Sequence, residues 1–175
     1  MQPTSCVLGI DLGTSAIKLL AVSRNCHVVA RARESYATIF TAAGQAEQDC
    51  QHWLKALSGA AKKIESQMTH KARVVGIALT GQMPTLVVLN QQQPVGPAIT
   101  WQDSREYGWV SERVDNKLRR HNYRRTGVLI DGRYLGPMFQ YHYGPKQKTG
   151  RILSAKDFLF HALTGLTATD PSTAS

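Results

Sequence analysis

The residues best suited to chemistry lie near the amino end, where a carboxylate is followed by a glycine and two hydroxyls. Asp11 precedes Gly13, Thr14 and Ser15, and Lys18 comes three residues later. Glycine lets backbone N–H groups approach phosphate oxygens, hydroxyls add donors, and a carboxylate can hold Mg²⁺ through water. The composition favours a phosphate loop, although it matches neither GxGxxG nor GxxxxGK[ST]. An ordinary hairpin turn is the alternative, because Asp-Leu-Gly-Thr needs no ligand to turn.

Three strands are expected to hold this turn. Each is rich in Val, Ile and Leu or alternates apolar with polar residues, and together they cover Cys6 to Asp11, Ala16 to Ser23 and His27 to Ser35. The short connections between them leave no room for a crossover helix, so an antiparallel meander is predicted. A phosphate would then lie at a hairpin turn and not at a helix N-terminus.

The next elements should complete a layered structure. Residues 37–46 are predicted to be a loop. From Asp49, a plausible N-cap, apolar residues recur at helical spacing as far as Met68 and predict one amphipathic helix. Val74 to Leu79 and Thr85 to Leu89 have the pattern of buried strands.

The remaining residues mix both kinds of element. Ala98 to Trp101 is expected to be extended, residues 103–121 helical, and residues 124–150 irregular or mixed. Ser154 to Leu163 predicts a short helix, with Ser154 as N-cap and Gly165 just past its end. The order of elements predicts an α/β fold, with a mixed sheet, in one globular domain.

The charge of the chain is large and uneven. Its 175 residues carry 21 Lys and Arg against 12 acidic residues, a formal charge of +9. Residues 105–151 hold eleven Lys and Arg against four acids, which is most of that excess. Such a cluster could meet nucleic acid or another anion. Because the segment has no nucleic-acid-reading motif, a solvated helix face explains it more simply.

Other sequence features point to an ordinary reduced protein. Cys6, Cys26 and Cys50 form no CxxC pair or metal-ligand cluster, so three free thiols are expected. No apolar stretch approaches the roughly 18 residues that would span a bilayer. Met1 to Ser5 lacks the features of a secretion signal. The predicted location is the cytoplasm, away from any membrane.

Several segments in order resemble the FGGY carbohydrate kinases, of the actin and hexokinase superfamily. GIDLGTSAIKLL, from Gly9 to Leu20, is similar to the opening of that family. Further resemblances lie in four later segments: AEQD from Ala46 followed by Trp53, VGIALTGQM from Val75, AITWQDSR from Ala98, and KDFL, LTG and TDPS between Lys156 and Ser172. Among these kinases the pattern is most like that of the xylulokinases.

The resemblance implies a ribonuclease-H-like first lobe, a second lobe that holds ATP, and a sugar or polyol substrate between them. Asp11 would help position Mg²⁺ and the transferred phosphate, the Gly13, Thr14 and Ser15 turn would lie beside the phosphates, and Lys18 would add charge. Such a kinase transfers the γ-phosphate of MgATP to a sugar hydroxyl. A homodimer is a further possibility.

The resemblance also implies a sugar side. Gln82 and Met83 would line the sugar pocket, with Pro84 next to them, and Asp103 with Trp101 would contact or shape the hydroxyl-binding side. Without the family context, residues such as Met83 and Trp101 are more often part of a core than in contact with a ligand. Asp103 could equally cap the following helix or form a weak surface pair with Arg105.

Two departures affect these expectations. The resemblance favours a ketopentose such as xylulose as the substrate. Pro84 stands where xylulokinases usually carry His, so the exact sugar is left open. The chain also ends where the family continues, so we expect residues 1–175 to be a truncated sugar-binding lobe, without the ATP-binding lobe and the catalytic base. It is therefore expected to be inactive alone. A non-catalytic sugar-binding or regulatory module, and an actin-like assembly module, are the alternatives.

Overall fold

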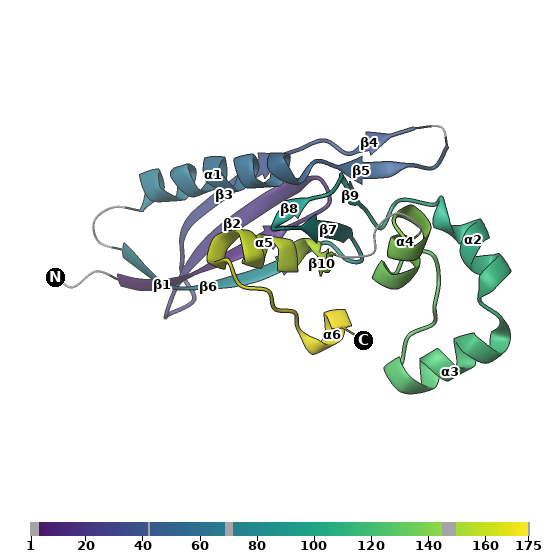
Figure 1. Ribbon diagram of the computed structural model, residues 1–175. Coiled ribbons are helices and arrows are strands. Elements are labelled where there is room, and N and C mark those ends of the chain that lie inside the picture. The colour runs from purple at the N-terminus through teal and green to yellow at the C-terminus, as the bar shows by residue number, and fades with distance from the viewer. Residues whose placement is uncertain (1–3, 42, 69–71, 145–149, 175) are drawn as a thin grey trace. The chain divides into compact units, whose positions relative to one another are not determined.

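The computed structural model describes residues 4–41, 43–68, 72–144 and 150–174 (Figure 1). The chain folds as two compact units, where the sequence predicted one globular domain. The first unit comprises Met1–Thr38 and Cys50–Gln82, and the second comprises Ile39–Asp49 and Met83–Ser175.

The first unit contains a four-stranded mixed sheet in the order β3-β2-β1-β6. Its strands are β1 (Thr4–Leu12), β2 (Ala16–Ser23), β3 (Val28–Ser35) and β6 (Ala72–Gly81). β1, β2 and β3 pair antiparallel, whereas β6 runs parallel to β1. The predicted meander and mixed sheet are therefore confirmed.

One long helix, α1 (Cys50–Gln67), lies along this sheet, as Figure 1 shows. Its buried positions, Trp53, Leu57, Ala60 and Ile64, recur every three or four residues, so they form one face of the helix. That face packs on β2 and β3. The predicted helix and its apolar stripe are confirmed.

β6 has a different environment from the one its sequence predicted. The pattern of Val74 to Leu79 indicated a buried strand, but no residue of β6 is buried, and Val75 and Ile77 are each more than half exposed. Among the described strands β6 ends the sheet, at the side away from β3. α1 packs chiefly on β2 and β3, and β6 stays partly exposed along its length.

The second unit is built on a six-stranded sheet in which every described pairing is antiparallel. Its strands are β4 (Ile39–Phe40), β5 (Ala46–Gln48), β7 (Leu86–Asn90), β8 (Gln93–Pro94), β9 (Ala98–Ile99) and β10 (Arg151–Ser154). The loop predicted over 37–46 is wrong in part, because β4 and β5 pair there as a hairpin. β4 and β5 are only two and three residues long, so the β-propensity of their residues did not predict them. They are strands because they pair with each other.

Five helices complete the second unit. They are α2 (Glu106–Arg113), α3 (Asn116–Thr126), α4 (Leu135–His142), α5 (Ala155–Thr164) and α6 (Pro171–Ala174). The single helix predicted over 103–121 is wrong: Asp115 interrupts it and caps α3 by accepting the Leu118 N–H at 2.7 Å. The segment predicted to be irregular or mixed, residues 124–150, contains α4. The predicted caps of α5 are confirmed, since Ser154 accepts the Asp157 N–H and Gly165 adopts a left-handed conformation.

The core of the second unit joins its sheet to α4. Leu86, Val88 and Ile99 from the sheet are buried with Met138 from α4. All four positions of β7 from Leu86 to Leu89 are buried, as its sequence predicted. Within the described parts of the chain, we find no helix with both the length and the apolar character needed to cross a membrane.

Candidate functional site

The turn between β1 and β2 is held from two sides. Within the hairpin, the Gly13 N–H donates to the Ala16 carbonyl at 3.1 Å. From outside it, the Tyr36 hydroxyl donates to the Gly13 carbonyl, and the Tyr36 N–H donates to the Ser15 carbonyl at 3.2 Å. Two backbone carbonyls of the predicted phosphate turn are therefore fixed by one residue that the sequence did not single out.

Gly13 is packed closely within this turn. A Cβ atom at Gly13 would lie 3.1 Å from the Ala16 carbonyl oxygen, and 3.7 Å from Oδ2 of Asp11. The first distance is shorter than ordinary van der Waals contact, so a side chain at Gly13 would force the Ala16 carbonyl to shift by a few tenths of an ångström. The glycine thus keeps the backbone of the turn close to the Asp11 carboxylate.

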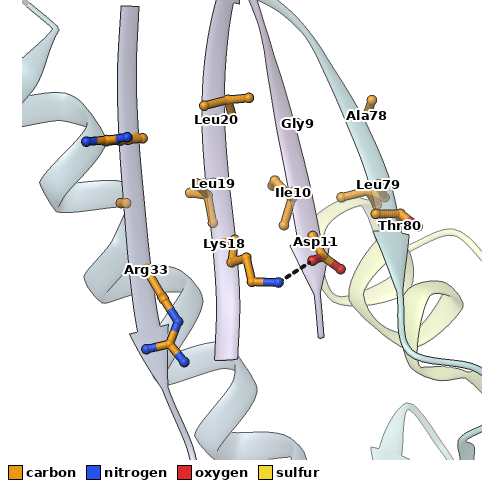
Figure 2. A pocket seen from close by; sticks show the side chains of 12 residues that line it. Gly9, Ile10, Asp11, Lys18, Leu19, Leu20, Arg33, Ala78, Leu79 and Thr80 are labelled. Atoms are coloured by element: carbon orange, nitrogen blue, oxygen red, sulfur yellow. Dashed lines mark hydrogen bonds and ion pairs between the residues drawn. The ribbon is translucent and has the colours of Figure 1, made fainter. Parts of the chain in front are cut away.

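Asp11 and Lys18 are paired residues of β1 and β2, and their side chains meet. Nζ of Lys18 lies 3.1 Å from Oδ2 of Asp11, with the two side chains 59% and 40% exposed. Figure 2 shows this contact between the two strands. It lies in a hollow of about 750 Å³ on the first unit. The hollow also includes Arg31 and Arg33 from β3. These arginines add positive charge beside Lys18. The sequence analysis missed them, although their spacing of two residues along β3 indicates that they lie on the same face of the sheet.

Tyr36 connects the turn to the helix layer. Its ring lies 6.5 Å from that of Trp53, centroid to centroid, in a tilted arrangement. Burial raises the pKa of the Tyr36 hydroxyl, and the negative charge of Asp11 raises that pKa further. The hydroxyl therefore stays protonated, as its hydrogen bond to Gly13 requires.

The chemistry of Asp11 fits a magnesium ion. Its carboxylate is an oxygen ligand, which Mg²⁺ prefers, and its partial exposure leaves room for the water molecules that Mg²⁺ retains. Of the described residues that line this hollow, Asp11 is the one with a carboxylate. Any metal here would accordingly keep most of its ligands from water or from a bound phosphate.

Asp103 lies in the second unit, on the turn between β9 and α2. Its side chain is fully buried, and Oδ2 accepts the Ala46 N–H at 2.9 Å. Oδ2 also accepts from Nη2 of Arg105 at 2.7 Å. Asp103 does not cap α2, whose N-cap is Arg105, and its pair with Arg105 is buried and not superficial. Both simpler interpretations of Asp103 are wrong.

Arg105 joins two carboxylates. Besides Asp103, Nη2 contacts Oε1 of Glu47 at 2.6 Å. Burial works to raise the pKa of Asp103, but hydrogen bonds from Arg105 and from the Ala46 N–H outweigh it and hold that pKa below its ordinary value. The arginine thus links the β4–β5 hairpin to the turn that carries Trp101 and Asp103.

The other predicted sugar-side residues divide between the two units. Gln82 is buried in the first unit, where its N–H donates to the Leu12 carbonyl at 2.8 Å. Met83, Pro84 and Trp101 belong to the second unit. Met83 and Trp101 are substantially exposed, so their interpretation as core residues is wrong. Sδ of Met83 accepts from the Thr173 hydroxyl at 3.6 Å.

Comparison with known proteins defines the class. The structure superposes on gluconate kinase from Lactobacillus acidophilus with a TM-score of 0.87 at 22% identity, over 98% of this chain and 35% of that one. The fold is therefore that of the sugar kinases with an actin-like ATPase architecture. Residues 6–175 match the model of the FGGY family of carbohydrate kinases, N-terminal domain, and the chain belongs to that family.

Two curated relatives of this chain are xylulose kinases. Those of Staphylococcus xylosus and Bacillus subtilis are each 33% identical over 97% of this chain. The chain spans only 36% and 35% of their lengths. The resemblance thus extends over nearly all of this chain and covers about a third of each relative.

Proposed function

We propose that residues 1–175 form the sugar-binding lobe of an ATP-dependent carbohydrate kinase, with a ketopentose such as xylulose as substrate. The observation that carries the proposal is the placement of the Asp11 carboxylate at a tightly hydrogen-bonded hairpin turn within a family of carbohydrate kinases. The similarity to two xylulose kinases supports the choice of sugar.

On the phosphate side, Asp11 would hold Mg²⁺ through water and orient the phosphate that is transferred. Gly13 keeps the turn tight, the N–H groups and hydroxyls of Thr14 and Ser15 would donate to phosphate oxygens, and Lys18 would offset the negative charge of the phosphates. Mg²⁺, when bound, neutralises charge on the phosphates. The fixed turn lets these groups act without costly rearrangement.

On the sugar side, we propose that Gln82, Met83, Pro84 and Trp101 contribute to the substrate site. An exposed indole suits the apolar face of a sugar, and fixed amide groups suit its hydroxyls. Asp103 has a different role in this proposal. Because its oxygens already accept hydrogen bonds from Arg105 and Ala46, it shapes the turn that presents Trp101.

A sugar-binding measurement tests the proposal on this chain. Titration with D-xylulose, followed calorimetrically, should give saturable binding that Trp101→Ala weakens at least tenfold. Trp109→Ala, on helix α2, is the matched control and should leave affinity unchanged. Gluconate and glycerol serve as competitors. Equal affinity for all three compounds, or no binding of any, would contradict the assignment of a ketopentose site.

Catalysis needs a second experiment. The chain should not phosphorylate xylulose with MgATP, because we propose that the ATP-holding lobe and catalytic base lie outside residues 1–175. The intact mass of the native gene product should then exceed twice 19.3 kDa. In that product, Asp11→Asn should lower kcat by about 10²-fold or more, the size expected for loss of a key electrostatic group. A native product near 19.3 kDa that binds sugar would instead favour the regulatory module.

A further inference from the structure

A second cluster of potential metal ligands lies in the second unit. Asp103, Glu106 and His142 each place one ligand atom so that all three atoms lie within 4.8 Å of one another. They come from the turn before α2, the first residue of α2 and the last residue of α4. The side chains of Asp103 and Glu106 are fully buried and that of His142 is 10% exposed.

Packing fixes the position of this cluster. α2 and α4 pack against each other, and Nε2 of His142 lies 2.5 Å from Oε1 of Glu106. A Cβ atom at Gly132 would lie 3.1 Å from the backbone carbon and the Cβ of Glu106. The main chain at Gly132 therefore lies directly against the start of α2, where Glu106 is anchored.

Negative charge exceeds positive charge at this place. Three buried or nearly buried carboxylates, those of Glu47, Asp103 and Glu106, occur together with one guanidinium, that of Arg105. Within the described ranges their ion-pair partners are Arg105 and His142. Arg105 is thus the permanently charged cation that Glu47 and Asp103 share, and burying an uncompensated carboxylate charge is costly.

Glu106 supplies an independent observation. Its side chain is fully buried, yet its Oε2 atom has no hydrogen-bond partner among the residues that the structure describes. A carboxylate oxygen without a partner in the interior is rare, because the loss of its hydration is not repaid. This oxygen belongs to the same carboxylate that contacts His142, so an ion bound by that carboxylate would supply the missing partner.

We propose that Glu106 and His142 bind a divalent transition-metal ion such as Zn²⁺, with Asp103 holding a metal-bound water. Imidazole nitrogen and carboxylate oxygen are ordinary Zn²⁺ ligands, whereas Mg²⁺ prefers oxygen ligands alone. Asp103 acts through water because its oxygens already accept from Arg105 and Ala46. The metal would replace the hydrogen bond between Glu106 and His142, with His142 neutral.

The site would have a structural consequence. It would join the end of α4 to the start of α2, beside the turn that carries Trp101 and Asp103. It lies in the second unit, whereas Asp11 lies in the first, and its ligand set differs. A test of this metal site is therefore independent of any test of the proposed kinase function.

Zinc titration of metal-free protein tests the proposal. The chain should carry Cys26→Ser, because Cys26 is an exposed thiol that could itself bind zinc. After dialysis against EDTA, Zn²⁺ should bind one to one by calorimetry and, at 100 times its Kd, raise Tm by about 5–10 °C. Mg²⁺ at the same concentration should leave Tm unchanged.

Variants locate the ion. Glu106→Gln and His142→Asn should each lower zinc affinity at least tenfold, whereas His121→Asn, an exposed histidine of α3, should have no effect. Should neither variant fold, the proton spectrum of the Cys26→Ser chain still decides, because Zn²⁺ must shift the ring signals of one histidine. Absence of one-to-one binding, or affinity unchanged in the folded variants, would overturn the proposal.

Discussion

The two units of this chain treat their charged groups in opposite ways. In the first unit, Asp11 and Lys18 meet at 3.1 Å on an exposed sheet surface, where water screens both. In the second unit, Asp103, Arg105 and Glu47 form a largely buried network, with Glu106 and His142 in a second buried pair.

This contrast indicates that the two groups of charged residues have different roles. An exposed pair can exchange partners at little cost, so the Asp11 carboxylate remains available to a metal ion or a phosphate. A buried network cannot exchange partners cheaply, because each group was desolvated when the protein folded. Asp103 and Arg105 therefore position the main chain, while Asp11 and Lys18 are suited to contact a ligand.

The strongest test of this contrast removes the shared cation of the buried network. Arg105→Met leaves Glu47 and Asp103 buried without their partner and should destabilise the protein by about 3–5 kcal/mol. Urea unfolding at neutral pH, followed by tryptophan fluorescence, measures the loss. Arg133→Met, which removes an exposed partner of Asp131, is the control and should cost at most about 1 kcal/mol. Equal losses would refute the contrast.

A pH series examines the same network through Asp103. The pKa of Asp103 is below its ordinary value in the folded protein, so its stabilisation is present above pH of about 4 and is lost as the pH falls further. Asp103→Asn should lower the free energy of unfolding by about 1–3 kcal/mol at pH 7. Its difference from wild type should shrink toward pH 3 in urea titrations. A difference independent of pH would show that the charge of Asp103 contributes nothing.

The phosphate turn should show a smaller effect. Tyr36→Phe removes the hydroxyl that donates to the Gly13 carbonyl and should cost about 1 kcal/mol in urea unfolding. Amide hydrogen exchange should become faster in residues 12–16, because the turn loses one of its two supports from Tyr36. Tyr123→Phe, an exposed residue of α3, is the matched control. Unchanged exchange in the turn would contradict a positioning role for Tyr36.

The smallest effect should come from the exposed pair itself. Lys18→Met should change the free energy of unfolding by no more than about 0.5 kcal/mol, because exposed ion pairs contribute little. Thermal unfolding at low and at high salt measures this effect. The change in Tm between the two salt concentrations should be as small for Lys18→Met as for the control Lys117→Met. A loss of 2 kcal/mol or more would mean that the two units do not differ as we infer.

Much of the fold followed from local sequence patterns. The alternating strands from Cys6 to Ser35, the apolar stripe of the α1 helix and the capped helix after Ser154 were all predicted from residues close together in the chain. These patterns succeed because strand and helix periodicity record which face of an element is buried. The motifs around Asp11 and Trp101 likewise identified the family.

Other features depended on residues distant in sequence. The β4–β5 hairpin, the exposure of β6 and the separation of α2 from α3 could not be inferred from local periodicity alone. Arg105 meets Glu47 across 58 positions, and His142 meets Glu106 across 36.

The sequence by itself thus determined the elements, the family and the identity of the groups that can do chemistry. Only the tertiary structure decided which of those groups are buried. The physical reason is that desolvation depends on everything packed around a side chain, whereas propensity and motif depend on its neighbours in the chain. Asp11 and Asp103 are the same residue type, and their surroundings give one an exposed carboxylate and the other a buried one.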